Sequence, residues 1–246
     1  DGQRFYGKQF IANLHPEVLL DLLHTRLIKP AYRNRIKKLE QTRSSFMLNL
    51  VLKPQAVPFR DHNIYWHRSQ DALAGINRSD KNSFETFAVY FTESKEEKGF
   101  AESVSILTYM DYDEVSAWSK TYNHTGAKEH RGDNYDAFKQ EKSEQLLKAV
   151  YEVVPEISGA ILAQSAATPL TFRDYTAAPE GALYGILKDV SKPAETTIAT
   201  RTKIPNLLLT GQNVNLHGVL GVSITAVATC AELLGMDYLL EKINCR

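Results

Sequence analysis

One segment near the C-terminal end constrains the fold more than any other part of the chain. The continuous apolar run Leu207-Leu208-Leu209 follows a proline and is ended by Thr210-Gly211. A short run of this kind is typical of a buried central strand. After a loop, a long apolar stretch runs from Gly218 to near Gly235, a residue suited to a helix C-terminal cap. We therefore expect a buried strand over 206–210 and a helix over 218–233, which together form an αβ unit.

The turn between this strand and helix suits an anionic or planar ligand. Backbone N–H groups at a helix start are unpaired, and the helix dipole favours negative charge there. Glycines at 211, 218 and 221 remove side chains where a ligand or another backbone approaches closely. Small residues suited to close packing follow along the helix: Ser223, Ala226, Ala228 and Ala231. A pyrophosphate or a flavin edge would fit against this turn, and a plain buried αβ unit is the alternative.

The turn departs from two better-known phosphate-binding patterns. No Gly-Lys-Ser/Thr follows it, so it is not a P-loop, and the sequence nowhere contains G-x-G-x-x-G. Likewise no G-x-S-x-G occurs, so a hydrolase nucleophile elbow is unsupported.

The remaining sequence predicts an α+β arrangement with an antiparallel sheet. Residues 9–13, within KQFIANLHP, indicate a strand that ends at a proline turn. Pro16 then opens a helix with apolar residues on one side: Val18, Leu19, Leu22 and Leu23. A second helix is expected over 31–39. Residues 45–53, 84–92 and 103–110 are rich in β-branched and aromatic residues, as strands are, and polar stretches such as 77–83 separate them. The helix at 135–152 has an apolar face formed by Tyr135, Phe138, Leu146, Leu147 and Val150.

Composition excludes some classes of function. Twenty-nine basic residues balance 29 acidic ones over 246 residues, which argues against nucleic-acid binding. Two cysteines, Cys230 and Cys245, make neither a disulfide framework nor a zinc site, and a reducing, cytoplasmic compartment fits them best. We expect Cys230 to be buried and Cys245 to be free. The run at 218–231 is short and contains hydroxyl groups, so a buried helix is expected there rather than a membrane span.

Specific similarity begins at PNLLLTGQNVNLHGVLGVSITAVATCAELLG, which resembles the C-terminal signature of the phytoene-desaturase, carotenoid-isomerase and retinol-saturase group. TPLTFRDYTAAPEGALYGI resembles the group's segment before its last strand, and KQFIANLHP its passage from the nucleotide domain to the substrate domain. The resemblance is strong over 165–235, fair over 7–25 and weak between them. The chain is then the C-terminal part of such a protein, without its N-terminal nucleotide-binding βαβ unit.

This resemblance implies an FAD-dependent oxidoreductase acting on a long apolar, polyene or isoprenoid-like substrate. It places FAD contacts at Gly211, Gln212, Asn213, His217, Gly218, Val219, Leu220 and Gly221. Many relatives have Asp where this chain has Gln212, so an amide of Gln212 or Asn213 would replace the carboxylate contact. Tyr184 and Gly185 are candidates for the flavin edge or substrate mouth, with a packed strand edge as the equal alternative. No catalytic side chain is named, and the chain alone is expected to bind FAD weakly.

Several His-containing patterns are interpreted as ordinary surface features. His62 and His67 are five residues apart, a poor match to metal spacings, and His124, Glu129 and His130 lie in a polar stretch typical of a loop. We expect no metal site at either place.

Three functional hypotheses remain open. The first is the flavin enzyme, divided into a passage segment (1–25), a substrate-binding α+β domain (26–165) and the C-terminal part of an FAD-binding domain (166–246). The second is a non-catalytic module that binds a lipid or a protein partner. The third is a subunit that completes its flavin site with a separate chain. The apolar substrate also suggests a cytoplasmic protein with peripheral membrane contact.

Overall fold

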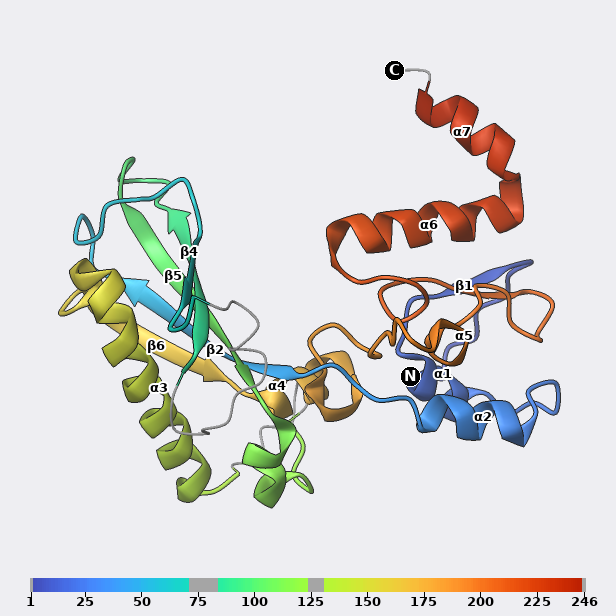
Figure 1. Ribbon diagram of the computed structural model, residues 1–246, viewed down its shortest axis with the longest axis horizontal. Coiled ribbons are helices and arrows are strands. Elements are labelled where there is room, and N and C mark those ends of the chain that lie inside the picture. Colours follow the sequence, from blue (N-terminus) through green and yellow to red (C-terminus); the bar gives the residue numbers. More distant parts are fainter. Residues whose placement is uncertain (1, 71–83, 124–130, 245–246) are drawn as a thin grey trace. The chain divides into compact units, whose positions relative to one another are not determined.

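The structure, a computed structural model, describes residues 2–70, 84–123 and 131–244. It comprises two compact units (Figure 1). The terminal unit joins the two ends of the chain, residues 1–42 and 177–246, and the central unit contains residues 43–176. The expected functional division at residues 25 and 165 stays a prediction. The stretch at 77–83, the residues His124, Glu129 and His130, and Cys245 lie outside the described residues.

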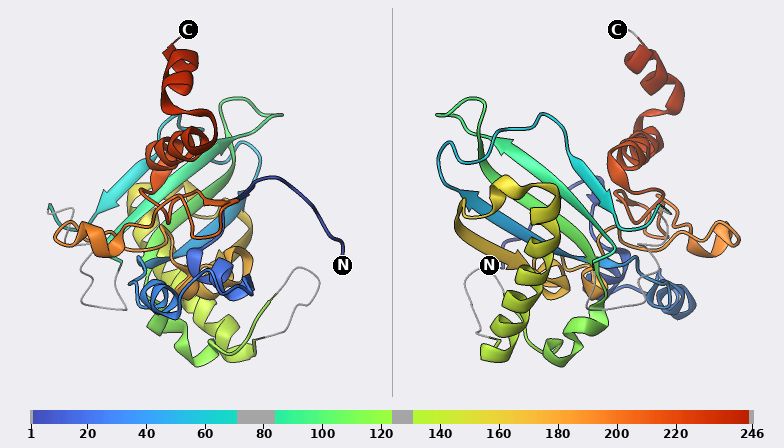
Figure 2. Two further views of the ribbon diagram at one scale, coloured as in Figure 1. Left: turned by 90° about the vertical axis from the view of Figure 1, so that its right-hand side faces the viewer. Right: turned by 60° about the vertical axis from the view of Figure 1, so that its left-hand side comes forward.

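The central unit is built on a five-stranded antiparallel sheet of order β3-β4-β5-β2-β6. Its strands are β2 (Ser44–Leu52), β3 (Ile64–His67), β4 (Thr86–Glu93), β5 (Ala101–Met110) and β6 (Ile161–Ala167). Its helices are α3 (Asp133–Val153), α4 (Pro169–Thr176) and the 3-10 turns η1 (Tyr112–Trp118) and η2 (Pro155–Ile157). Figures 1 and 2 show α3 lying along one face of the sheet.

Buried and half-buried side chains alternate along β2 and β5, and this alternation shows which face of the sheet is covered. Phe46, Leu48 and Leu50 of β2 are buried, and they form one core with Leu146 and Val150 of α3. The intervening residues point to the opposite face, which is only half-buried: Met47, Asn49, Ser105, Leu107 and Tyr109. A side-chain period of two therefore gives the sheet one dry face and one accessible face.

The terminal unit contains the strand–turn–helix segment. Its sheet is the parallel pair β1 (Phe10–Ala12) and β7 (Leu207–Leu209). Its helices are α1 (Pro16–Leu22), α2 (Pro30–Lys37), α5 (Pro193–Thr196), α6 (Gly218–Leu234) and α7 (Met236–Asn244), with the 3-10 turn η3 (Pro179–Gly181). All three residues of β7 are buried, and Leu207 and Leu209 belong to a second core with residues of α1 and α2. Among the described residues, no helix is both long and apolar enough to cross a bilayer.

The expected fold class is confirmed, and so are its main elements. The buried strand and its helix lie at 207–209 and 218–234, and Gly235 ends α6 with a φ of 88°. The three expected strands correspond to β2, β4 and β5, and the helix at 135–152 to α3. On α3, Tyr135, Leu146, Leu147 and Val150 are buried as predicted.

Three packing expectations were wrong. On α1 the buried residues are Pro16, Leu19 and Leu20, whereas Leu22 is 64% exposed. The helix ends after two turns, and its apolar stripe is shifted by one position. On α6 only Gly221, Thr225 and Thr229 are buried, since β7 covers a single narrow face. Ser223 and Ala226 are exposed, and Cys230 is only half-buried.

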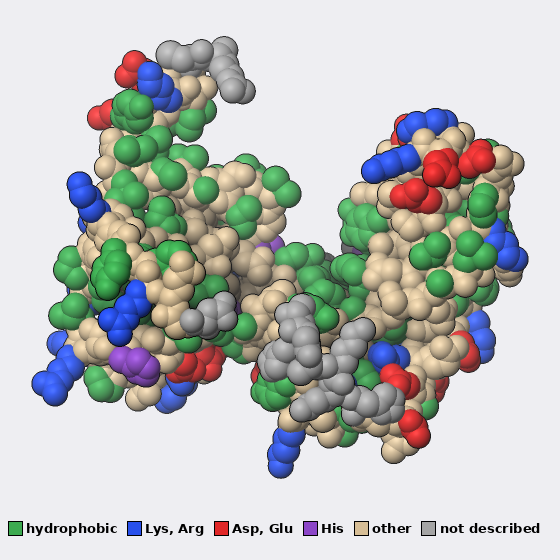
Figure 3. All heavy atoms as spheres, turned by 180° about the vertical axis from the view of Figure 1, so that it is seen from behind, with side chains coloured by type: hydrophobic (Ala, Val, Ile, Leu, Met, Phe, Trp, Pro, Cys, Tyr) green, Lys and Arg blue, Asp and Glu red, His purple; other side chains and the backbone are tan. Residues whose placement is uncertain are grey.

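Exposed apolar residues gather on the last two helices. They include Val219, Leu220, Leu234, Met236, Leu240 and Ile243, and Figure 3 shows hydrophobic side chains spread over this part of the surface. α7 has no buried residue among those described. An exposed apolar surface of this extent is typical of a site that contacts another protein segment, a ligand or a membrane.

Candidate functional site

The candidate site is the turn that follows β7. β7 hydrogen-bonds to β1 on one edge, and on the other edge the N–H of Leu209 donates to the carbonyl of Thr200 over 2.8 Å. The strand is thereby held on both sides, and its end is fixed in position. α6 lies on β7 through Thr229, whose one hydroxyl hydrogen is shared between the carbonyl oxygens of Leu209 and Thr225, 3.1 and 2.8 Å from Oγ1.

The three glycines of the turn have different physical roles. A Cβ on Gly211 would lie 2.1 Å from Oδ1 of Asn13, so this glycine lets the β1 end approach β7. A Cβ on Gly221 would lie 2.6 Å from Cβ of Leu216, so the glycine allows the loop before α6 to pass close to the first turn of that helix. A Cβ on Gly218 would meet nothing within 4 Å, although its φ of 75° favours glycine. Gly218 is thus the glycine of the turn that faces open space.

Asn213 is turned into the protein. Its Oδ1 accepts a hydrogen bond from the N–H of Ile186 over 3.0 Å, and a Cβ on Gly185 would lie 2.0 Å from the same atom. Gly185 and Asn213, expected on separate grounds, are therefore in direct contact. Gly185 is needed for this approach, and the Asn213 side chain holds the segment at 184–186 against the turn.

Tyr184 and His217 lie together at the edge of the turn. Their ring centroids are 4.7 Å apart with an interplanar angle of 31°. The N–H of Tyr184 also donates to Oγ1 of Thr42 over 3.0 Å, and the carbonyl of Gly185 accepts from the N–H of Thr42 over 2.7 Å. The substrate-side and cofactor-side candidates thus share one rim of aromatic rings.

The beginning of α6 is the exposed part of the site. Val219 and Leu220 are 86% and 75% exposed, His217 and Gly218 are exposed, and Gln212 is half-buried. His217 is the N-cap residue, and its side chain makes no capping hydrogen bond. The first N–H groups of α6 therefore have no side-chain cap from His217, which is the arrangement in which a helix start receives an anion or a cofactor oxygen.

Lys188 anchors the turn from a neighbouring loop. Its Nζ donates to the carbonyl oxygens of Asn213, Thr196 and Val214 over 2.8, 3.0 and 3.4 Å. Burial, with the nearby charge of Arg35, lowers the pKa of Lys188 to about 8, so it remains mainly protonated at neutral pH. Sequence analysis missed this residue, because a single lysine in a polar loop carries no periodic or spacing signal.

His15 holds the start of α1, directly after β1. Its Nδ1 accepts from the N–H of Glu17 over 3.3 Å, so the proton lies on Nε2, which is 3.1 Å from Oε1 of Gln41. Burial lowers the pKa of His15 and thereby favours the neutral ring that this arrangement requires. His15 was also missed, although its place before a proline at a helix start could have suggested a cap.

Comparison with known proteins finds sequences similar to this chain. No protein-family model matches it. Over 137 residues, 54% of the chain, it is 31% identical to all-trans-retinol 13,14-reductase of Danio rerio. Over 94 residues, 37% of the chain, it is 35% identical to the protein of that name from Homo sapiens. Over these stretches the chain is similar to the all-trans-retinol 13,14-reductases.

These relatives confirm the resemblance to the retinol-saturase group that the sequence predicted. The matched stretches span only 21% of the fish protein and 15% of the human protein. A crystal structure of an oxidoreductase from Methanosarcina mazei is similar with a TM-score of 0.54, over 94% of this chain and 44% of its own, at 13% sequence identity. That likeness concerns the fold alone. The contacts of the ten candidate site residues with a cofactor or a substrate stay predictions.

Proposed function

We propose that this chain is part of an FAD-dependent oxidoreductase that saturates, desaturates or isomerises a long apolar polyene. The observation that carries the proposal is the turn after β7, where an open glycine, Gly218, begins a helix whose N-cap side chain provides no capping bond. The relationship to retinol reductases adds support from sequence.

The residues of the turn fit a flavin edge rather than a phosphate chain. Val219 and Leu220 offer apolar contact beside the free N–H groups of the helix start, and no Lys or Arg lies within 211–221. A planar ring with polar oxygens along one edge matches that combination. Gln212, Gly218, Val219 and Leu220 would hold the ring, and Gly211, Asn213 and Gly221 would shape the turn. When bound, FAD would supply the hydride chemistry.

The central unit supplies a surface of suitable character for a polyene. The accessible face of its sheet carries Met47, Leu107 and Tyr109, each half-buried, together with the hydrogen-bonded pair Asn49 and Ser105. Pockets for apolar ligands are lined in this way, by apolar and aromatic groups with a few polar ones. Peripheral membrane contact belongs to the same proposal, since α7 exposes Met236, Leu240 and Ile243.

The test is to produce the longer protein from its gene and to record its visible absorption spectrum. A bound flavin that is first reduced chemically with dithionite, and then reoxidised as it passes two electrons and two protons to a double bond of an added polyene alcohol, supports the proposal. A protein that folds without flavin, and stays free of it after incubation with FAD, overturns it. The non-catalytic module then becomes the better explanation of the same fold.

A further inference from the structure

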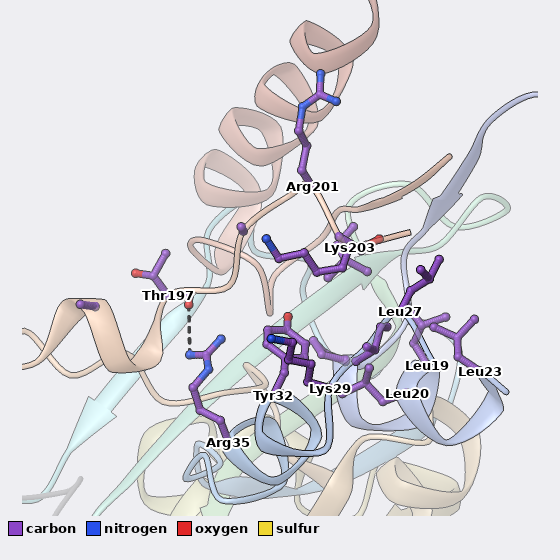
Figure 4. A pocket seen from close by; sticks show the side chains of 16 residues that line it. Leu19, Leu20, Leu23, Leu27, Lys29, Tyr32, Arg35, Thr197, Arg201 and Lys203 are labelled. Carbon is purple, nitrogen blue, oxygen red and sulfur yellow. Dashed lines mark hydrogen bonds between the residues drawn. The ribbon is translucent and has the colours of Figure 1, made fainter. Parts of the chain in front are cut away.

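The terminal unit contains a cavity that is separate from the turn after β7. Its volume is about 670 Å³, within the range of small-molecule pockets. Its wall is formed by α1, the loop after it, α2, the segment from 194 to 203, and Leu209 of β7. In Figure 4, four leucines gather on one side of this cavity: Leu19, Leu20, Leu23 and Leu27.

The charged groups of the cavity all have one sign. Lys29, Arg35, Arg201 and Lys203 line it, and none of the described residues that line it is Asp or Glu. Arg201 is paired with Glu232 outside the cavity, and Arg35 donates to the carbonyl of Glu195 over 2.8 Å, which leaves its positive charge uncompensated. Lys29 and Lys203 form no ion pair within the described part of the chain.

We propose that this cavity binds a single-chain amphipathic carboxylate, such as a long-chain fatty acid. The leucines would cover the chain, and Lys29 and Lys203 would face the carboxylate, with the hydroxyl of Tyr32 on the same wall. Apolar burial provides affinity that rises roughly in proportion to chain length. The uncompensated cations select a negative head group over a neutral one. This site is independent of the proposed flavin chemistry, and it is tested without FAD.

The probe is cis-parinaric acid, a fluorescent polyene fatty acid, titrated into the purified full-length protein without added FAD and displaced by oleate. Lys29→Met with Lys203→Met keeps the apolar stems and removes both charges. We expect about three- to tenfold weaker binding, the effect of two exposed ion pairs. Lys148→Met, an exposed change on α3 in the central unit, should leave binding unchanged.

A second pair of variants tests the apolar wall. Leu27→Asp places a carboxylate beside the bound chain at a residue that is 55% exposed, so folding should survive and binding should fall. Leu22→Asp is the matched control, because Leu22 is 64% exposed on α1 and does not line the cavity. Thermal unfolding of all variants verifies that each is folded.

Three results would overturn the proposal. Oleyl alcohol displacing the probe as well as oleate would show that the cations do not select the head group. Decyl phosphate displacing it more strongly than decanoate would assign the cavity to a phosphate head instead. Equal binding by the wild type, the double lysine variant and Leu27→Asp would place the probe elsewhere.

Discussion

At the scale of single residues, the glycines of the turn after β7 have two roles: Gly211 and Gly221 are needed for packing, and Gly218 faces open space. Gly211 and Gly221 are held by close contacts with Asn13 and Leu216, respectively. Gly218 has no neighbour within 4 Å of a built Cβ. A side chain there would thus cost backbone strain of about 1–2 kcal/mol from the left-handed φ, without a steric clash in the described chain.

We expect Gly218→Val to lower the flavin content of the longer protein more than its strain alone accounts for. The branched side chain would occupy the space beside the helix N–H groups, where the ring is proposed to lie. The measurement is flavin per folded protein, together with thermal unfolding of the apoprotein. Gly235→Val is the matched control, because Gly235 has a φ of 88° and open space at the other end of α6. Equal flavin content in the two variants would argue against a cofactor at Gly218.

His15 gives an expectation for pH. Its pKa in the folded chain is lowered by burial, so the unfolded chain binds the proton more readily below about pH 6.5. The neutral His15 ring therefore contributes fully to the stability of the folded chain above about pH 6.5, and this contribution is lost as the pH falls below it. In His15→Asn, which keeps a capping group, the decrease in melting temperature between pH 7.5 and 5 should be smaller than in the wild type. An unchanged decrease would assign the pH dependence to other groups.

At the scale of elements, a stripe of small residues attaches α6 to β7. Thr229 donates to the carbonyl of Leu209, whereas Thr225 donates only within its own helix, to Gly221. Thr229→Val should destabilise the chain by about 1–3 kcal/mol, because it removes a donor from the buried end of β7. Thr225→Val changes the same shape at an equally buried place and should cost less. Urea unfolding of both compares them, and equal losses would mean that shape alone holds the helix.

The same elements show what sequence patterns can and cannot predict. β2, β4 and β5 were predictable because they are rich in β-branched and aromatic residues, and α3 because its apolar residues fall on one helix face. β6 was not, since its sequence ILAQSAA is short of large β-branched residues and most of it is exposed. The exposure of α6 was also missed, because an apolar composition does not say which faces a neighbour covers. Similarly, Lys188 and Gln41 act through long-range contacts that no local pattern encodes.

At the scale of the whole molecule, the proposed cofactor site has one strand–turn–helix segment in the described chain, the turn between β7 and α6. β1 and β7 form the only parallel pair among the described strands, and the sequence contains no G-x-G-x-x-G. In dinucleotide-binding folds, the Gly-rich βα turn supplies the contacts to the pyrophosphate. In the proposed site the turn after β7 contacts the flavin end of the cofactor, so the affinity of this turn alone for FAD should be low.

The 246-residue chain, produced by itself, should therefore be colourless as purified, and it should take up FAD only weakly when the cofactor is added. The physical reason is that ring contacts at Gln212, Gly218 and Val219 must offset the loss of freedom of the whole dinucleotide, most of which stays in solvent. Absorption of the purified chain and equilibrium dialysis against FAD measure this directly. Heat-unfolded chain serves as the control for non-specific uptake. A yellow preparation with stoichiometric FAD would contradict the expectation, and would mean that the terminal unit binds the dinucleotide through contacts other than a Gly-rich βα turn.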